Sequence, residues 1–226
     1  MLILAVDTTT LSGSVALLEN TRLLSEAGFD SPSTHSRRLL PAIDFVLKTS
    51  QKEVNEIEGY AAAVGPGSFT GIRIGLSTVK SLAFASGKPI GAVSTLQALA
   101  LKLRHPQAKL LCPIVDAKKG EVYAALFESS LLEMREIIPQ GVYGPDDFFS
   151  NLPSHRVIYF IGNGLEVYRE KLLRYLKDRA RFPRRSYFIG FEVGLLGYEL
   201  LRDGKGVGSQ DLEPLYFRKS QAEEKN

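Results

Sequence analysis

The sequence predicts an α/β protein built from two small domains. An apolar strand that ends in aspartate, a turn and a second strand occur twice along the chain, and each copy is followed by a strand, a Gly-x-Gly turn and a helical segment. The 226 residues, 44% of them hydrophobic, suffice for two cores. We expect an N-terminal domain over residues 1–103 and a C-terminal domain over 104–226, with the last segment, about 211–219, docking back on the first domain.

The first half opens with a strand pattern. Residues 2–7 are apolar up to Asp7, a polar turn covers 8–13, and an apolar run over 14–18 predicts a second strand. The segment 22–29 can extend this antiparallel sheet.

The second half repeats the same order of elements. An apolar strand over 110–116 ends in Asp116, a turn over 117–120 contains glycine, and 121–127 predicts the next strand. The match between the halves lies in the order of elements more than in residue identity. In chain order, helices are expected over 36–50, 71–86, 95–103, 165–178 and 191–202.

A glycine-rich turn over 65–71 joins an apolar strand to a helical pattern. Such a turn can direct the unpaired N–H groups of a helix N-terminus at an anion. The segment matches neither the Walker loop nor the dinucleotide fingerprint, because it lacks Gly-Lys-Ser/Thr and has Thr70 where the fingerprint needs glycine. The alternative is a tight strand-to-helix turn with Ser68 or Thr70 as the N-cap, and both interpretations stay open.

Composition bounds the function classes. The net charge is +3, which neither requires nor excludes a nucleic-acid partner. The single cysteine, Cys112, lies in an apolar strand, so it excludes an internal disulfide framework, is expected in the core, and fits a reducing cytoplasm. Residues 1–4 are too short an apolar run for a signal peptide, and no run approaches the roughly 20 residues of a membrane span. We therefore expect a cytoplasmic protein with no membrane partner.

Basic residues gather late in the chain. This cluster is either a solvated helix face with its following loop or a contact for nucleic acid, and the sequence leaves that choice open. Its members are Arg169, Lys171, Arg174, Lys177, Arg179, Arg181, Arg184 and Arg185.

The duplicated strand–Asp–turn–strand opening resembles the actin-like ATPase superfold (ASKHA, ribonuclease-H-like). Within it, the chain resembles the TsaB (YeaZ) family, the dimerisation subunit of bacterial tRNA threonylcarbamoyladenosine synthase. The matching segments run in order along nearly the whole chain, less clearly over 127–153. They are Ala5-Val6-Asp7-Thr8, His35-Ser36-x-x-Leu39-Leu40-Pro41-x-Ile43, Gly67-Ser68-Phe69-Thr70-Gly71-Ile72-Arg73-Ile74-Gly75, Val93-Ser94-Thr95-Leu96, Asp116-Ala117-Lys118-Lys119-Gly120-Glu121-Val122-Tyr123 and Pro214-Leu215-Tyr216-Phe217-Arg218.

The resemblance implies a non-catalytic scaffold or activator subunit. Its partner would be a larger catalytic paralogue (TsaD) with a His-x-x-x-His metal site, which forms N6-threonylcarbamoyladenosine beside the tRNA anticodon. A P-loop ATPase (TsaE) and tRNA would join through the complex, and the chain would form a homodimer when the paralogue is absent. No tightly bound cofactor is implied, and ATP or ADP is left as a candidate ligand at the partner interface.

The residues themselves are compatible with a role without chemistry. The three histidines, His35, His105 and His155, are too far apart in sequence to form a helical metal-binding pair. Asp7 and Asp116 are either turn-capping residues or the phosphate-side carboxylates of a small-molecule kinase or ATPase, the alternative function. The candidate nucleotide or anion contacts are Asp7, Thr8, Thr9, Gly67, Ser68, Thr70, Lys118 and Lys119.

Two helical segments are the candidates for the partner interface. The first has an apolar arc wider than one core needs, and the family resemblance favours the interface interpretation. The alternative is that both helices are buried inside this domain. On the interface hypothesis, Leu40→Glu or Leu76→Glu weakens partner binding without unfolding the monomer, and Arg73, a cation in the first turn of the second helix, meets a carboxylate or phosphate of the partner. The predicted interface residues are His35, Leu39, Leu40, Ile43, Leu47, Ile72, Arg73, Leu76, Val79, Lys80 and Ala83.

Overall fold

The computed structural model describes residues 1–30, 35–130 and 133–218. The chain forms two compact units: Met1–Ala98 with Phe188–Tyr216, and Leu99–Tyr187 with Phe217 and Arg218. We expected the second domain to run from residue 104 to the end of the chain. The structure instead places residues 188–216 in the first unit.

The first unit is built on a five-stranded sheet in the order β3-β2-β1-β4-β5. Its strands are β1 (Leu2–Asp7), β2 (Ser12–Glu19), β3 (Arg22–Asp30), β4 (Gly59–Gly65) and β5 (Ile90–Ser94). β2 runs antiparallel to β1, and β3 runs antiparallel to β2, as the short connections between these strands allow. β4 and β5 run parallel to β1 after helical crossovers.

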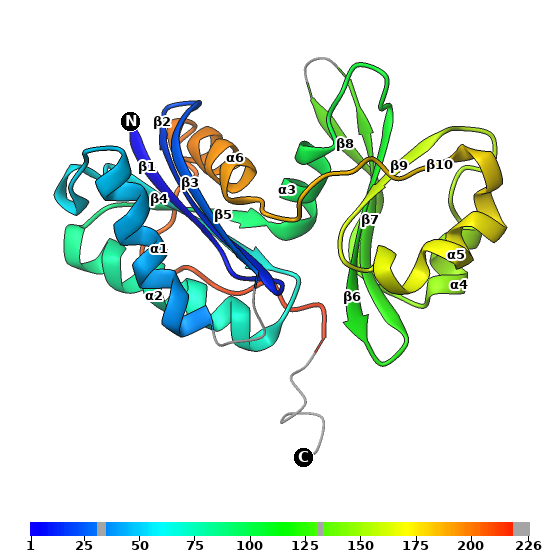
Figure 1. Ribbon diagram of the computed structural model, residues 1–226, viewed down its shortest axis with the longest axis horizontal. Helices are drawn as coiled ribbons and strands as arrows, with labels where there is room; N and C mark the ends of the chain where they lie inside the picture. Colours follow the sequence, from blue (N-terminus) through cyan, green and yellow to red (C-terminus); the bar gives the residue numbers. More distant parts are fainter. Residues whose placement is uncertain (31–34, 131–132, 219–226) are drawn as a thin grey trace. The chain divides into compact units, whose positions relative to one another are not determined.

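Helices cover both faces of this sheet (Figure 1). On one face lie α1 (His35–Thr49), which packs on β2 and β3, and α2 (Phe69–Ser86), which packs on β1 and β4. A single 3-10 turn, η1 (Val54–Glu56), precedes β4. The opposite face is covered by α6 (Gly190–Arg202), which contacts β1, β2, β4 and β5.

The backbone of α6 lies directly on the sheet. A Cβ atom at Gly197 would fall 2.3 Å from Ala61 Cβ, and one at Gly91 of β5 would fall 2.7 Å from Gly197 Cα. Only glycine permits this approach, so Gly91 and Gly197 allow α6 to pack closely against the first sheet. The helical pattern of 191–202 was predicted correctly, but it carries no information on which sheet the helix covers.

The second unit has the same topology. Its sheet order, β10-β9-β6-β7-β8, is the order of the first sheet written from the other edge, so the duplication predicted from the sequence is present. α3 (Thr95–Lys102) begins in the first unit and ends in the second. The other elements of the second unit are β6 (Leu110–Lys118), β7 (Glu121–Ser129), β8 (Met134–Tyr143), α4 (Pro145–Ser150), β9 (Ile158–Ile161), α5 (Leu165–Leu176), η2 (Lys177–Arg179) and β10 (Ala180–Arg181).

Candidate functional site

The turn after β1 is held by a buried carboxyl. Asp7 is fully buried, and its Oδ1 accepts hydrogen bonds from the backbone N–H of Thr9 at 2.9 Å and from Thr9 Oγ1 at 2.7 Å. Its Oδ2 is buried and has no hydrogen-bond partner among the described residues. Burial raises the pKa of Asp7 to about 6, although the two Thr9 hydrogen bonds oppose this shift.

The glycine-rich segment is joined to this turn by hydrogen bonds. The N–H of Ser68 donates to Thr9 O at 2.7 Å, and Thr8 Oγ1 donates to Gly71 O at 2.7 Å. Ser68 is the N-cap of α2, because its Oγ accepts a hydrogen bond from Gly71 N at 3.3 Å. Of the two caps considered from the sequence, Ser68 is therefore the one observed.

The glycines of this segment allow the two turns to touch. A Cβ atom at Gly67 would lie 2.1 Å from Thr9 O, and one at Gly71 would lie 2.1 Å from Thr8 O. Close backbone packing thus accounts for both glycines, as the tight-turn interpretation expected. An anion contact at Gly67, Ser68 or Thr70 stays a prediction, as do contacts at Asp7, Thr8 and Thr9.

The corresponding turn of the second unit carries two lysines. Lys118, Lys119 and Gly120 all have positive φ angles, of 60°, 53° and 79°. Asp116 accepts from Lys118 N at 2.8 Å and from Lys118 Nζ at 2.7 Å, and the hydrogen bond to this carboxylate raises the pKa of Lys118. The Asp116 carboxylate therefore caps its own turn, as the structural interpretation of this residue expected. A nucleotide contact at Lys118 or Lys119 stays a prediction.

Most of the predicted interface residues are buried in the core of the first unit. This burial corrects the expectation that they form an accessible surface, because they face the sheet that α1 and α2 cover. The residues concerned are Leu39, Ile43, Leu47, Ile72, Leu76, Val79 and Ala83. Leu40, Arg73 and Lys80 are exposed or half-buried, and the side chain of His35 lies outside the described residues.

Arg73 has partners within the chain. Its guanidinium carbon lies 3.9 Å from the centroid of the Phe69 ring, and its Nε donates to Tyr216 Oη at 3.2 Å. The Phe69 and Tyr216 rings stack with centroids 5.0 Å apart, and Leu215 N donates to Val64 O at 2.8 Å. These contacts join the segment before residue 217 to the first unit.

Two large side chains on α1 and one on α2 remain exposed. Leu40 is 59% exposed, Phe45 54% and Phe84 73%. Phe84 was missing from the predicted interface. With Arg73 and Lys80 it follows the i, i+7, i+11 spacing of one helix stripe, and this spacing was the signal that could have identified it.

The chain offers little metal or thiol chemistry in its described part. No group of three or more His, Cys, Asp or Glu residues in that part is placed to hold a metal ion. Cys112 is buried, as expected, and burial raises the pKa of its thiol well above the usual range, so the reactive thiolate is disfavoured. Among the described residues, every helix is too short or too polar to cross a membrane.

Comparison with known proteins identifies the family. The family model of tRNA N6-adenosine threonylcarbamoyltransferase (TsaD) matches residues 30–181. The tRNA threonylcarbamoyladenosine biosynthesis protein TsaB of Bacillus subtilis is 30% identical over 233 residues, which cover 100% of this chain and 97% of that protein. The chain belongs to the TsaB family.

Solved structures agree with this assignment. YeaZ from Pseudomonas aeruginosa superposes on 95% of the chain with 99% of its own length covered, a TM-score of 0.80 and 29% identity. The ethanolamine utilization protein EutJ from Carboxydothermus hydrogenoformans shares the fold alone, with a TM-score of 0.54 and 12% identity. The prediction of a duplicated actin-like α/β architecture, and the resemblance to TsaB, are confirmed.

Proposed function

We propose that this TsaB-family chain is a non-catalytic subunit in the formation of N6-threonylcarbamoyladenosine in tRNA, and that it binds the catalytic paralogue. Family membership supports the pathway, since the relative from Bacillus subtilis is named for this biosynthesis. A TsaD family model matches 30–181, which supports a common architecture for the chain and its paralogue. Two chains of one architecture can pair through equivalent surfaces, as in a two-fold dimer.

The observation that carries the proposal is the exposure of three large apolar side chains on α1 and α2. Both helices already bury a complete row of apolar residues in their own core, yet Leu40, Phe45 and Phe84 remain more than half exposed. Exposed large hydrophobic residues on adjacent helices are typical of a protein–protein contact. We infer that these helices meet the corresponding helices of the paralogue in a four-helix contact burying at least ~1,200 Å² in total. The same surface would support a homodimer in the paralogue's absence.

The first test is complex formation with the paralogue from the same organism. We expect a one-to-one heterodimer by light scattering after size exclusion. Leu40→Glu and Phe84→Glu each place a charge in the contact, so we expect each to raise the Kd roughly ten-fold or more, with an unchanged circular dichroism spectrum. Val54→Glu is the matched control, because Val54 is 47% exposed on η1, outside α1 and α2. A heterodimer that tolerates both helix variants contradicts the proposed surface.

The second test separates a scaffold from an enzyme. We expect the isolated chain to hydrolyse no ATP and to transfer no threonylcarbamoyl group, and the complex with the paralogue, TsaE and tRNA to do so. ATP or ADP binding is to be measured on the chain and on the heterodimer. ATP turnover by the isolated chain that disappears in Asp7→Ala would instead support the kinase or ATPase alternative.

A further inference from the structure

The second unit contains a cavity that the proposed function leaves unused. It has a volume of about 540 Å³ and lies between the end of β9, the first turns of α5 and the segment 182–187 after β10. All the residues that line it belong to the second unit. Ligand sites of α/β sheets commonly lie at the carboxyl ends of parallel strands, and β9 and β10 are parallel.

The lining of this cavity is basic. Arg169, Arg184 and Arg185 contribute three guanidinium groups, against the single carboxylate of Glu166. All three arginines are exposed, and within the described part of the chain none forms an ion pair with a carboxylate. Their positive charge is therefore available to an anionic ligand.

The guanidinium of Arg169 is already held in place. Its carbon lies 4.8 Å from the centroid of the Phe182 ring, and Phe182 stacks on the buried Phe160 with centroids 5.6 Å apart. This cation–π contact restricts the guanidinium, so a ligand has less side-chain freedom to remove on binding. A planar guanidinium suits phosphate oxygens, which can accept two parallel hydrogen bonds.

Tyr187 adds a neutral donor to the same cavity. The side chain is half-buried, and burial above all, followed by the neighbouring Glu166, raises the pKa of its hydroxyl. The phenol therefore keeps its proton at physiological pH and can donate a hydrogen bond to a phosphate oxygen.

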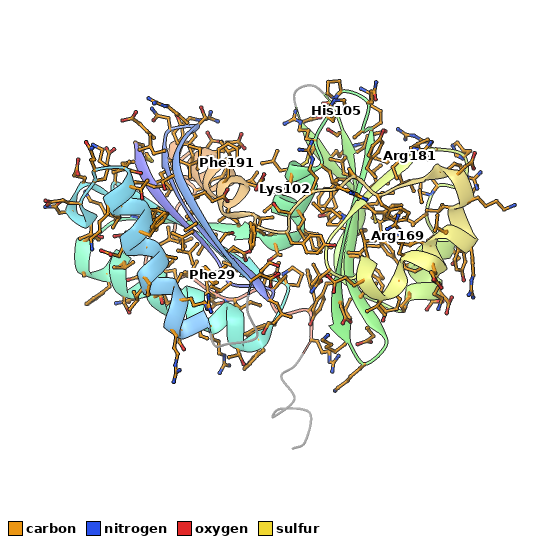
Figure 2. All side chains as sticks on the ribbon, viewed as in Figure 1. Phe29, Lys102, His105, Arg169, Arg181 and Phe191 are labelled. Atoms are coloured by element: carbon orange, nitrogen blue, oxygen red, sulfur yellow. The ribbon has the colours of Figure 1, made fainter. Side chains whose placement is uncertain are left out.

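Cationic side chains continue beyond the cavity. Residues 165–187 contain eight Lys and Arg but three Asp and Glu, and Arg174, Lys177 and Arg181 are exposed. Figure 2 shows Arg169 and Arg181, both labelled, in the region of α5 and β10. An extended set of cations that continues beyond the cavity fits a polymer with a phosphate at each residue better than it fits a small anion.

We propose that this cavity binds the phosphate backbone of tRNA, with Arg169, Arg184 and Arg185 as the phosphate ligands. The proposal rests on the proposed function, because it takes the RNA to be the substrate of the assembly. It assigns to this chain direct contact with the RNA rather than contact through its partners alone.

The test is the affinity of the heterodimer for unmodified tRNA, measured by fluorescence anisotropy over a range of salt concentrations. For Arg184→Gln/Arg185→Gln we expect the Kd to rise roughly ten-fold. The negative slope of the logarithm of the association constant against log[salt] should become smaller in magnitude by about 1.5, as for the loss of two phosphate contacts. Arg22→Gln/Lys88→Gln is the matched control, because it removes two exposed charges from the first unit. Unchanged affinity and slope in the first variant, or an equal effect in the control, would overturn the proposal.

A variant that is expected to bind tRNA more tightly provides an independent test. Glu166→Gln removes the one carboxylate that lines the cavity, so we expect tighter tRNA binding, a result that misfolding cannot produce. A parallel titration with ATP separates a nucleotide site from an RNA site. Lost ATP binding with retained tRNA binding in the double arginine variant would overturn the RNA assignment.

Light scattering of the same samples distinguishes the two proposals. If the wild-type chain forms no heterodimer, the proposed function fails. If the heterodimer forms and the arginine variants bind tRNA like wild type, only the cavity assignment fails.

Discussion

A buried carboxyl at the end of β1 makes the stability of the first unit dependent on pH. Asp7 is fully buried and burial raises its pKa to about 6, above the unfolded value of about 3.8. Well below pH 3.8 both states hold the proton. Between pH 4 and 6 the unfolded chain releases it first, so the free energy of unfolding falls as the pH rises. The ionised carboxyl then costs about 3 kcal/mol at pH 7.

Replacement of Asp7 by asparagine tests this cost. Asp7→Asn keeps an oxygen for the two Thr9 hydrogen bonds but cannot ionise, so we expect it to exceed wild type in stability by up to about 3 kcal/mol at pH 7. At pH 4 the difference should shrink to about 0.5 kcal/mol. Urea denaturation at both pH values measures the difference, with the exposed Asp44→Asn as the control. An identical pH dependence in Asp7→Asn and wild type would contradict the assignment.

The close approach of two turns makes Gly71 sensitive to a single methyl group. Alanine is favoured over glycine in a helix by about 1 kcal/mol, yet its Cβ would lie 2.1 Å from Thr8 O. We expect Gly71→Ala to lower the free energy of unfolding by about 1–3 kcal/mol, because backbone atoms cannot move aside cheaply. Chemical denaturation measures this loss. In the control Gly144→Ala the nearest atom is a carboxylate oxygen 3.2 Å away, so little change is expected.

At the scale of the element, the two sides of α1 and α2 have opposite roles. Leu76 is 4% exposed and packs in the core, so Leu76→Ala should cost about 2–5 kcal/mol of unfolding free energy, and Leu76→Glu should unfold the chain. Leu40 is 59% exposed, and Leu40→Ala should stay within about 0.5 kcal/mol of wild type. Thermal and urea denaturation of both alanine variants test the contrast. Equal losses would contradict the burial of these helices.

Periodicity explains which elements the sequence predicted. The helices of the first unit have regular apolar spacing and the strand over 110–116 is a continuous apolar run, and the structure places these elements within a few residues of the expected bounds. β8 was missed because its residues are mostly half-buried or exposed and its pairing with β7 shifts register twice. α4 was missed because six residues are too few to establish a helical period.

The candidate site was predictable only in part. The sequence identified Ser68 as a possible N-cap and found the two turns that carry Asp7 and Asp116. The apolar residues of a helix do not reveal how many of them its own sheet will cover. The apolar residues of α1 and α2 were therefore predicted to contact a partner, although most of them are buried against the sheet of the first unit. The cavity beside Phe182 needs residues from three separate segments, and their proximity is a property of the fold.

At the scale of the whole molecule, the first unit is discontinuous in sequence. Residues 188–216 return to it, and α6 covers one face of its sheet. A chain ended at residue 187 should expose that apolar face, so we expect rapid proteolysis within residues 1–98 and a loss of cooperative unfolding. Limited proteolysis followed by mass spectrometry locates the cuts. A synthetic peptide of residues 188–216 should restore protection, and a truncated chain that resists protease without it would contradict the prediction.

The return of the chain to the first unit also sets an order on its assembly during translation. When the ribosome has made residues 1–98, every strand of the first sheet has been synthesised, but the helix that shields one of its faces has not. The intervening stretch, 99–187, must leave the exit tunnel before α6 does. The apolar face of the first sheet therefore remains uncovered while most of the second unit is synthesised. During this interval a chaperone or a neighbouring nascent chain can bind that face.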